Sequence, residues 1–129
     1  MKEKVKFVFE DLHVWKKAVL FAEMAIDLSE NLNQNRKHYR LIEQLEAAST
    51  SIALNIAEGR GRNSKKEFIQ FLFIARGSLY ETIALLEIFS NKRWIEIEKL
   101  EELKILGEEI NKMISGMVKM LKGKLQVRS

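Results

Sequence analysis

The sequence predicts an all-α protein, an antiparallel up-down-up-down four-helix bundle. Three observations predict this class. The 129 residues include no proline and only six glycines, so few residues interrupt a helical pattern. Alanine, leucine, glutamate and lysine, which favour helices, are abundant. Apolar residues recur at helical spacing in four segments, and the short connections between these segments favour antiparallel neighbours.

The chain is expected to form a single domain, residues 1–129, with a short N-terminal extension at about 1–9 and a basic C-terminal tail at about 123–129. A chain of this length buries about two-thirds of its unfolded surface, which suffices for a core. Without cysteine, disulfides and thiolate zinc sites are excluded. The net charge of +4 and the pI of about 9.3 permit attraction to nucleic acid but do not require it.

The sequence predicts a cytoplasmic protein with no membrane partner. Arg76, Glu81 and Glu87 interrupt the most apolar segment, residues 68–89, so no apolar run of transmembrane length is expected. The first six residues are rich in lysine but lack the apolar stretch of a signal peptide.

The first two helices are predicted from about Asp11 to Asn31 and from about Lys37 to Glu58. Asp11 is expected to be the N-cap of the first helix, and Gly59 the left-handed C-terminal cap of the second. The apolar stripe of the first helix consists of Leu12, Trp15, Val19, Ala22 and Ile26. The stripe of the second consists of Leu41, Leu45, Ala48, Ile52 and Ile56.

The third helix is predicted from Ser64 to about Ser90, and the fourth from about Glu96 to Lys122. Ser64 and Glu67 match a capping box, in which each side chain accepts a hydrogen bond from the other residue's backbone N–H. The fourth helix has a coiled-coil-like seam with spacings of three and four. Its members are Leu100, Leu103, Gly107, Ile110, Ile114, Met117 and Leu121. The glycine in this seam would let another helix approach closely.

Two helices carry more apolar surface than a lone four-helix bundle needs. The first has a second stripe, and the third is almost continuously apolar over residues 68–75. Large exposed apolar patches are uncommon on monomers, so the sequence predicts a homo-oligomer. The predicted interface residues are Val14, Phe21, Leu28 and Phe73. The alternative is a monomer with an unusually apolar surface.

Polar residues line one face of the second helix, beside its apolar stripe. A buried Glu58 would need a partner, and Arg76 is the predicted one. We interpret these residues as a buried polar layer that fixes the helix register. The layer consists of Gln44, Ser51, Asn55, Glu58 and Arg76. The alternative is a catalytic pocket in which Glu58 acts as an acid or base.

The sequence gives little support for catalysis. A single carboxylate without a second acid, nucleophile or metal is weak support for an active site, so no catalytic residue is assigned. His13 and His38 have no metal-ligand spacing, and the Glu-x-x-His pairs of a di-iron bundle are absent. The sequence therefore predicts no metal site, no cofactor and no enzymatic activity.

Four cations surround the predicted turn between the second and third helices. They are Arg60, Arg62, Lys65 and Lys66. The turn is not a Walker A motif, but the free N–H groups of a helix N-terminus attract anions, so this surface could hold nucleic-acid phosphates. Arg36 and Lys37 could extend it. The alternative is a solvated turn whose charges only maintain solubility.

Short motifs follow one another over most of the chain. They are Phe9–Ala18, Gln44–Leu45, Ser51–Ile52, Asn55–Gly59, Gly61–Arg62, Ser64, Glu67–Phe68, Phe71–Leu72, Ile74–Leu79 and Glu81. Together they resemble the small four-helix-bundle family encoded in intervening sequences of bacterial 23S rRNA genes. The resemblance implies a cytoplasmic bundle that assembles as a ring-like homopentamer. The chain is also similar to the accessory protein of diversity-generating retroelements, a basic pentamer that associates with a reverse transcriptase and nucleic acid.

The chain departs from the family pattern in its second helix. Glu46 and Ala47 stand where the family usually has two arginines, and Ala53 where it often has proline. The change removes about two potential phosphate contacts. The predicted function is a non-enzymatic oligomeric bundle that associates with RNA or DNA. The alternative is a structural or adaptor protein whose homo-oligomer binds a protein partner.

Overall fold

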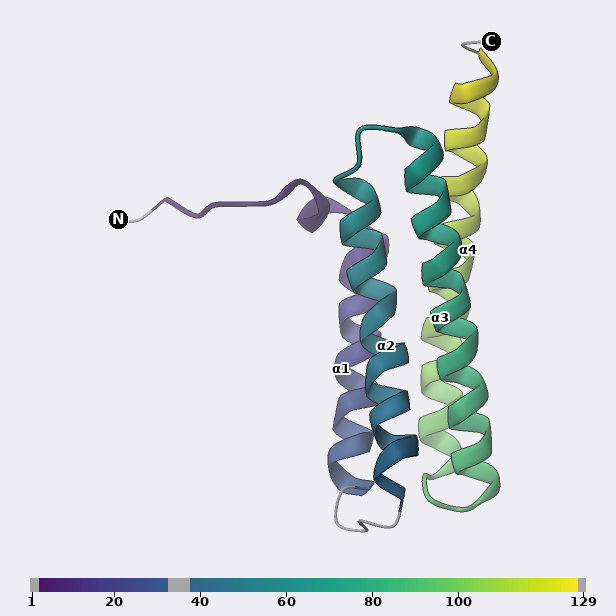
Figure 1. Ribbon diagram of the computed structural model, residues 1–129. Coiled ribbons are helices and arrows are strands. Elements are labelled where there is room, and N and C mark those ends of the chain that lie inside the picture. The colour runs from purple at the N-terminus through teal and green to yellow at the C-terminus, as the bar shows by residue number, and fades with distance from the viewer. Residues whose placement is uncertain (1–2, 33–37, 128–129) are drawn as a thin grey trace.

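The computed structural model describes residues 3–32 and 38–127, and these residues form helices and connections without a strand (Figure 1). A short 3-10 helix, η1 (Val8–Asp11), precedes four long helices. The long helices are α1 (His13–Leu32), α2 (Tyr39–Arg60), α3 (Lys65–Asn91) and α4 (Ile97–Val127). The all-α prediction is confirmed, and the described helix boundaries lie within one or two residues of their predicted positions, with one exception. Helix α4 continues to Val127, so residues 123–127, which were expected to form a C-terminal tail, belong to the helix.

Consecutive helices run in opposite directions. In Figure 1, α1 and α3 descend and α2 and α4 ascend, so the α2–α3 turn and the C-terminal end of α4 lie at one end of the bundle. We call this the upper end. Both α1 and α3 contact α2 and α4, whereas no helix in the described ranges contacts its diagonal counterpart. The four helices therefore surround one shared core.

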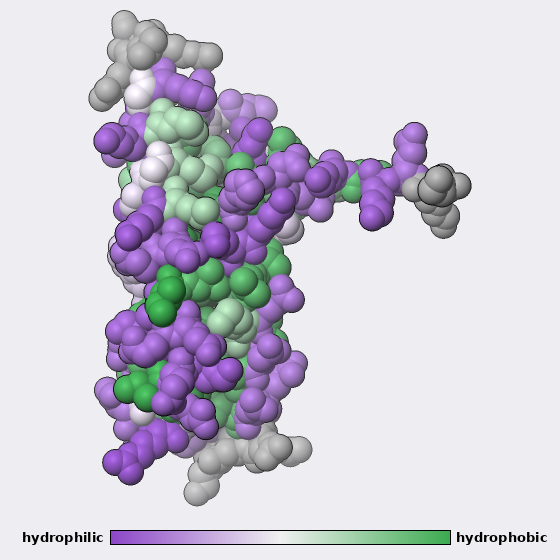
Figure 2. Space-filling model, turned by 180° about the vertical axis from the view of Figure 1, so that it is seen from behind, coloured by the Kyte–Doolittle hydropathy of each residue, from purple (hydrophilic) through white to green (hydrophobic). Residues whose placement is uncertain are grey.

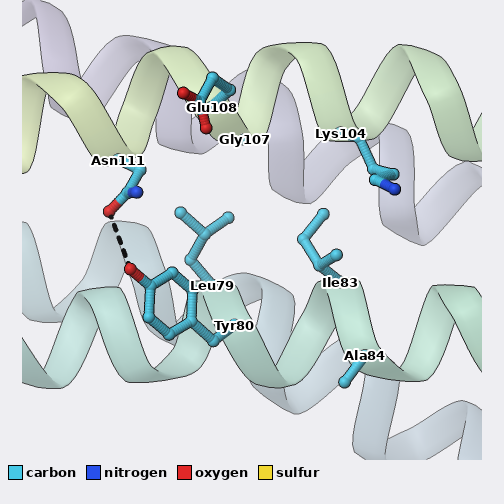
Figure 3. Close-up of a pocket in the computed structure, with 8 residues that line it drawn as sticks. All are labelled: Leu79, Tyr80, Ile83, Ala84, Lys104, Gly107, Glu108 and Asn111. Carbon is cyan, nitrogen blue, oxygen red and sulfur yellow. Dashed lines mark hydrogen bonds between the residues drawn. The ribbon is translucent and has the colours of Figure 1, made fainter.

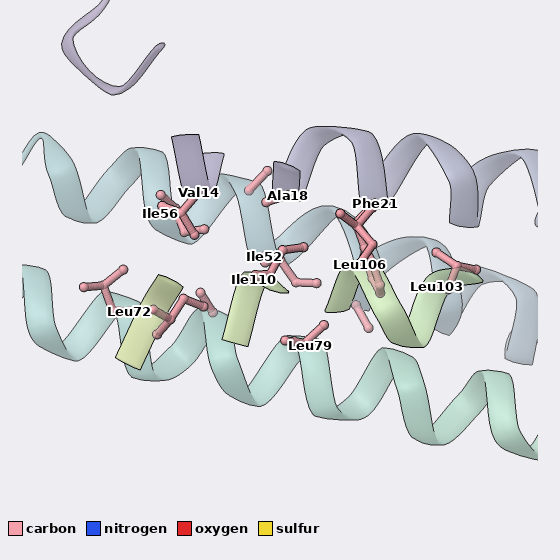
Figure 4. Packing of buried hydrophobic residues seen from close by; sticks show 14 of the residues in the cluster. Val14, Ala18, Phe21, Ile52, Ile56, Leu72, Leu79, Leu103, Leu106 and Ile110 are labelled. Carbon is pink, nitrogen blue, oxygen red and sulfur yellow. The ribbon is translucent and has the colours of Figure 1, made fainter. Parts of the chain in front are cut away.

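The core receives large apolar side chains from all four helices (Figure 4). Each fully buried side chain of this kind contributes roughly 1.5–3 kcal/mol to folding. The seam predicted for α4 is confirmed, since all its members are buried except the half-buried Met117. Fully buried examples are Phe21, Leu45, Ile52, Ile56, Leu72, Leu86, Phe89, Leu103, Ile110 and Ile114.

Helix α1 buries the stripe that was expected to lie at a subunit interface. Val14, Ala18, Phe21 and Ala25 are buried in the core, and Leu28 packs against it. Placing an interface at Val14, Phe21 and Leu28 is therefore wrong, because these side chains pack within a single chain. In the stripe assigned to the core, only Ala22 is buried; the half-buried members are Leu12, Trp15, Val19 and Ile26.

The start of α1 differs from the prediction. Asp11 ends η1 instead of capping α1, and its carboxylate accepts a hydrogen bond from Lys6 Nζ at 3.0 Å. Glu10 Oε2 accepts a second bond from the backbone N–H of Phe7 at 2.7 Å. Residues 3–7, which we call the N-terminal arm, project sideways from the upper half of the bundle (Figure 1). Its Val5 and Phe7 side chains are exposed.

The α2–α3 turn is only partly as predicted. Gly59 lies inside α2, and Gly61 follows the helix at a right-handed φ of −80°, so a left-handed cap at Gly59 is wrong. Ser64 is the N-cap of α3, because its hydroxyl accepts the Glu67 backbone N–H at 3.2 Å. The Glu67 carboxylate lies 4.0 Å from Arg62 Nε, and no return bond to Ser64 is formed among the described residues. Half of the capping box is therefore present.

By length and composition, α3 is apolar enough to cross a membrane. The charges at Arg76, Glu81 and Glu87 do not by themselves exclude this, contrary to the sequence-based expectation. In the structure, α3 packs between α2 and α4 and contributes buried residues along its whole length, from Phe68 to Phe89. A core helix of a bundle shows the same high apolar content.

Candidate nucleic-acid interface

The predicted cations at the α2–α3 turn differ in how strongly the protein holds them. Arg62 NH2 lies 2.9 Å from Glu58 Oε1. The Arg62 guanidinium also lies 4.8 Å from the centroid of the Phe71 ring, in a cation–π arrangement. Its charge is thus partly compensated by Glu58, and its side chain is fixed against α3.

The other three turn cations have no such partner. Within the described part of the chain, no carboxylate lies within 4.0 Å of Arg60, Lys65 or Lys66. Arg60 and Lys65 are half-buried, and Lys66 is exposed. The two lysines occupy the first turn of α3, where backbone N–H groups lack helical partners and favour anions. The remaining predicted cations, Arg36 and Lys37, lie outside the described residues.

The predicted polar layer joins α2 to α3 through two hydroxyls. Ser51 Oγ and Ser78 Oγ are 2.9 Å apart. Asn55 Nδ2 donates to the carbonyl oxygen and to the hydroxyl of Ser51, both at 2.8 Å. These side chains are half-buried. Gln44 is exposed, and its Nε2 lies 3.4 Å from Glu81 Oε2. The polar contacts therefore lie at the edge of the core and not within it.

The predicted pair of Glu58 and Arg76 is wrong. The Glu58 side chain is 56% exposed and pairs with Arg62, one turn further along the chain. Arg76 points to α4 instead, where its NH2 donates to Ser115 Oγ at 2.6 Å. An exposed carboxylate needs no distant partner, because solvent and a neighbouring arginine satisfy it. Sequence reasoning missed Ser115, whose only signal is its place in the acid-free half of α4.

The two histidines lie apart, and among the residues that the structure describes only His38 has a stacking partner. His38 stacks on Trp94 with ring centroids 4.2 Å apart, and His13 lines a groove between α1 and α4. Among residues 3–32 and 38–127, no cluster of three or more His, Cys, Asp or Glu side chains is arranged to hold a metal ion.

Two grooves follow α4. The groove against α1 has a volume of about 370 Å³ and is lined by apolar residues, including Met113, Met117 and Met120. Figure 2 views this side, where apolar residues gather along the seam between hydrophilic ones. The groove against the middle of α3 also has about 370 Å³. There Tyr80 and Asn111 face each other, and the Tyr80 hydroxyl donates to Asn111 Oδ1 at 3.4 Å (Figure 3).

Lys104 lies beside the second groove and bonds to Glu87 on α3. Lys104 Nζ donates to Glu87 Oε1 at 2.8 Å. This hydrogen bond, together with the negative charge of Glu87, raises the pKa of Lys104 above its usual value. Lys104 is thus paired with a carboxylate, whereas within the described ranges the turn lysines are not.

The helices, their antiparallel order and the basic turn define the class: an all-α four-helix bundle whose described residues hold no cluster arranged to bind a metal ion. The chain belongs to the 23S rRNA-intervening sequence protein family, whose sequence profile matches residues 10–116. The resemblance inferred from the motifs is thereby confirmed.

A solved structure agrees with this assignment. The chain is similar to a crystal structure of a protein of unknown function from the S23 ribosomal protein family of Bacteroides thetaiotaomicron. The two share 30% identity and a TM-score of 0.77, and the match covers 82% of this chain and 98% of that one. No match was found among curated proteins.

Proposed function

We propose that this protein is a non-enzymatic, cytoplasmic homo-oligomer that binds RNA or DNA through the phosphate backbone. The observation that carries the proposal is the unneutralised charge at the upper end. Arg60, Lys65 and Lys66 have no carboxylate within 4.0 Å in the described residues. The second half of α4, which ends nearby, carries lysines and has no acidic residue after Glu109.

Such a surface supports binding without base specificity. Arginine and lysine contact phosphate oxygens, which are the same in every sequence. Each phosphate contact releases counterions, so three contacts give a slope of about −2 to −3 in a plot of log affinity against log salt concentration. Glu46 lies half-buried and accepts a hydrogen bond from Ser29, so the family's usual arginine at this position is replaced by an inward-bonded acid.

The test is a salt titration of the binding of a mixed-sequence single-stranded RNA. The variant Arg60→Gln/Lys65→Gln/Lys66→Gln should bind at least tenfold more weakly at low salt and with a slope reduced by about 2. The matched control is Arg40→Gln/Lys92→Gln/Lys99→Gln, which removes the same charge at the opposite end. Equal losses in the two variants, or no binding by the parent protein at low salt, would rule out a phosphate-binding turn.

Assembly is proposed to use apolar surface that a single chain leaves uncovered. The N-terminal arm exposes Val5 and Phe7, and the groove between α1 and α4 exposes Met120. Family resemblance favours a pentamer. Native mass spectrometry should detect this state for the parent protein and smaller species for Phe7→Glu and Met120→Glu. The control Leu54→Glu, at an exposed site on α2, should keep the parent mass. A parent mass equal to one chain would refute assembly.

The methionine-lined groove favours one alternative, an adaptor that binds a protein partner. Methionine side chains adapt to different apolar surfaces and are common where partner helices bind. An adaptor would keep its native mass on adding RNA and would show no salt-dependent RNA binding. The proposed function predicts that the mass increases on adding RNA.

A further inference from the structure

A second basic feature lies on the side of the bundle, between α3 and the C-terminal half of α4. It is an open groove of about 650 Å³ with three cations among its lining residues. We call it the α3–α4 basic pocket. Its lining residues are Phe73, Arg76, Ser115, Val118, Lys119, Lys122 and Gly123. No acidic residue lines it, and it shares no residue with the α2–α3 turn.

Acidic residues are absent from both helices over this stretch. On α3 there is no acidic residue between Glu67 and Glu81, and on α4 there is none after Glu109. Elsewhere along the same helices lysines are paired: Lys104 with Glu87 at 2.8 Å, and Lys112 with Glu108 at 3.7 Å. The pocket cations have no carboxylate within 4.0 Å among the described residues. Their mutual repulsion is relieved only by a bound anion or by solvent.

The side chain of Phe73 brings two of these cations together. The guanidinium carbon of Arg76 lies 5.6 Å from the centroid of its ring, and Lys122 Nζ lies 5.5 Å from the same centroid. Cations are attracted to aromatic faces, so the ring keeps them close despite their equal charge. Arg76 is fixed further by its bond to Ser115. The cationic groups are therefore positioned by contacts from both helices.

Arg76 also has an unused donor. Its Nε is buried and has no hydrogen-bond acceptor. Native proteins rarely leave a buried donor unpaired, and where this occurs an ion or water commonly supplies the acceptor. The guanidinium carries its N–H donors in a planar fork. Phosphate oxygens match this geometry, whereas a lysine offers only a point charge.

We propose that the α3–α4 basic pocket binds a phosphate group, either as inorganic phosphate or as the phosphomonoester of a small molecule. Arg76 would provide the paired donors, and Lys119 and Lys122 the neutralising charge. The inference goes beyond the proposed backbone binding, because it concerns the groove between α3 and α4, and none of Arg60, Lys65 and Lys66 takes part.

The test is calorimetric titration of the full chain with inorganic phosphate in a chloride buffer at low ionic strength. Charge-assisted contacts from Arg76, Lys119 and Lys122 predict saturable binding of one phosphate per chain. The expected dissociation constant is about 1 mM or lower. Lys122→Gln should weaken binding about tenfold. Arg76→Lys keeps the charge but loses the planar fork, so it should weaken binding by a similar factor. Circular dichroism confirms that each variant is folded.

The control is Lys112→Gln, which removes the same charge from the same helix outside the pocket and should bind phosphate like the parent. The turn variant Arg60→Gln/Lys65→Gln/Lys66→Gln should also keep its phosphate affinity, so this test and the RNA test fail independently. Ribose 5-phosphate distinguishes the two sources: tighter binding than phosphate indicates a phosphomonoester. Non-saturable binding, or equal weakening in Lys112→Gln and Lys122→Gln, would overturn the proposal.

Discussion

Gly59 and Phe71 are in contact at a distance that leaves no space for a side chain at position 59. A Cβ on Gly59 would lie 2.6 Å from Phe71 Cβ and 3.0 Å from Phe68 Cδ1. We expect Gly59→Ala to destabilise the protein by about 1–3 kcal/mol, because α2 and α3 must separate to accept the methyl group. This loss exceeds the gain in helix propensity, which is at most about 1 kcal/mol. The loss of unfolding free energy can be measured by urea denaturation, with circular dichroism as the signal.

Gly77 provides the matched control for that measurement. It lies in the middle of α3, and a Cβ built there meets no atom within 4 Å. Gly77→Ala should therefore stabilise the protein by up to about 1 kcal/mol through helix propensity alone. If both alanine variants were more stable than the parent, α2 and α3 would not approach as closely at Gly59 as the structure shows.

Phe21 should behave as a core residue and not as an interface residue. It is fully buried within one chain. Phe21→Ala should lower the free energy of unfolding by about 3–5 kcal/mol, since it leaves a cavity among packed neighbours. Phe73→Ala, at a side chain that is 42% exposed, should cost much less. Equal losses of unfolding free energy, measured by chemical denaturation, would contradict the placement of Phe21 in the core and Phe73 at the surface.

The contact between Ser29 and Glu46 should stabilise the packing of α1 on α2. Ser29 is fully buried, and its hydroxyl lies 2.7 Å from Glu46 Oε2 and 2.8 Å from the Ile26 carbonyl oxygen. A hydroxyl has one proton, so it donates to one of the two at a time. Ser29→Ala should cost about 1–2 kcal/mol. In a double-mutant cycle with Glu46→Ala, a coupling energy of zero would mean that the bond contributes nothing.

The contact between Lys6 in the N-terminal arm and Asp11 should be lost in acid. The hydrogen bond from Lys6, followed by its positive charge, lowers the pKa of Asp11. A lowered carboxyl pKa in the folded state stabilises the contact between Lys6 and Asp11 above the unfolded pKa of 3.8, and this contribution disappears as the pH falls through the folded-state pKa. The pKa of Lys6 is raised by the same bond, so the contribution also disappears in strong alkali, as the pH rises through that value.

Nuclear magnetic resonance can follow the loss of this contact through the Asp11 carboxyl signal and the backbone dynamics of residues 3–7. Asp11→Asn should give an arm that is mobile at neutral pH. An arm whose dynamics are the same in both proteins at pH 7 would show that the Lys6 contact does not hold it.

Sequence periodicity predicted the helices well because their ends carry local signals. Ser64 caps α3 through its own turn, and the α4 seam repeats over a long segment. Periodicity could not choose between the two stripes of α1. Phe21 and Trp15 both belong to apolar stripes, and only the positions of α2 and α4 determine which stripe is buried. Composition could not make this choice either.

The candidate sites were harder to predict, because each depends on which helix lies next to a side chain. Glu58 was expected to need a distant partner, but it lies near the end of α2, where solvent and Arg62 are available. Arg76 was assigned to the α2 side of α3 and lies on the α4 side, beside Ser115. The two environments lie on different sides of α3, and sequence alone does not fix how the helix is rotated about its axis.

The charge order along α4 has a consequence for how the molecule meets its surroundings. Acidic residues concentrate between Glu96 and Glu109, and only cations follow. Because α4 runs the length of the bundle and the turn cations lie at its C-terminal end, the charges of α4 and the turn form an electric dipole along the long axis. A polyanion in solution would exert a torque on such a molecule before any contact forms. Collisions would thus begin with the upper end already facing the polyanion.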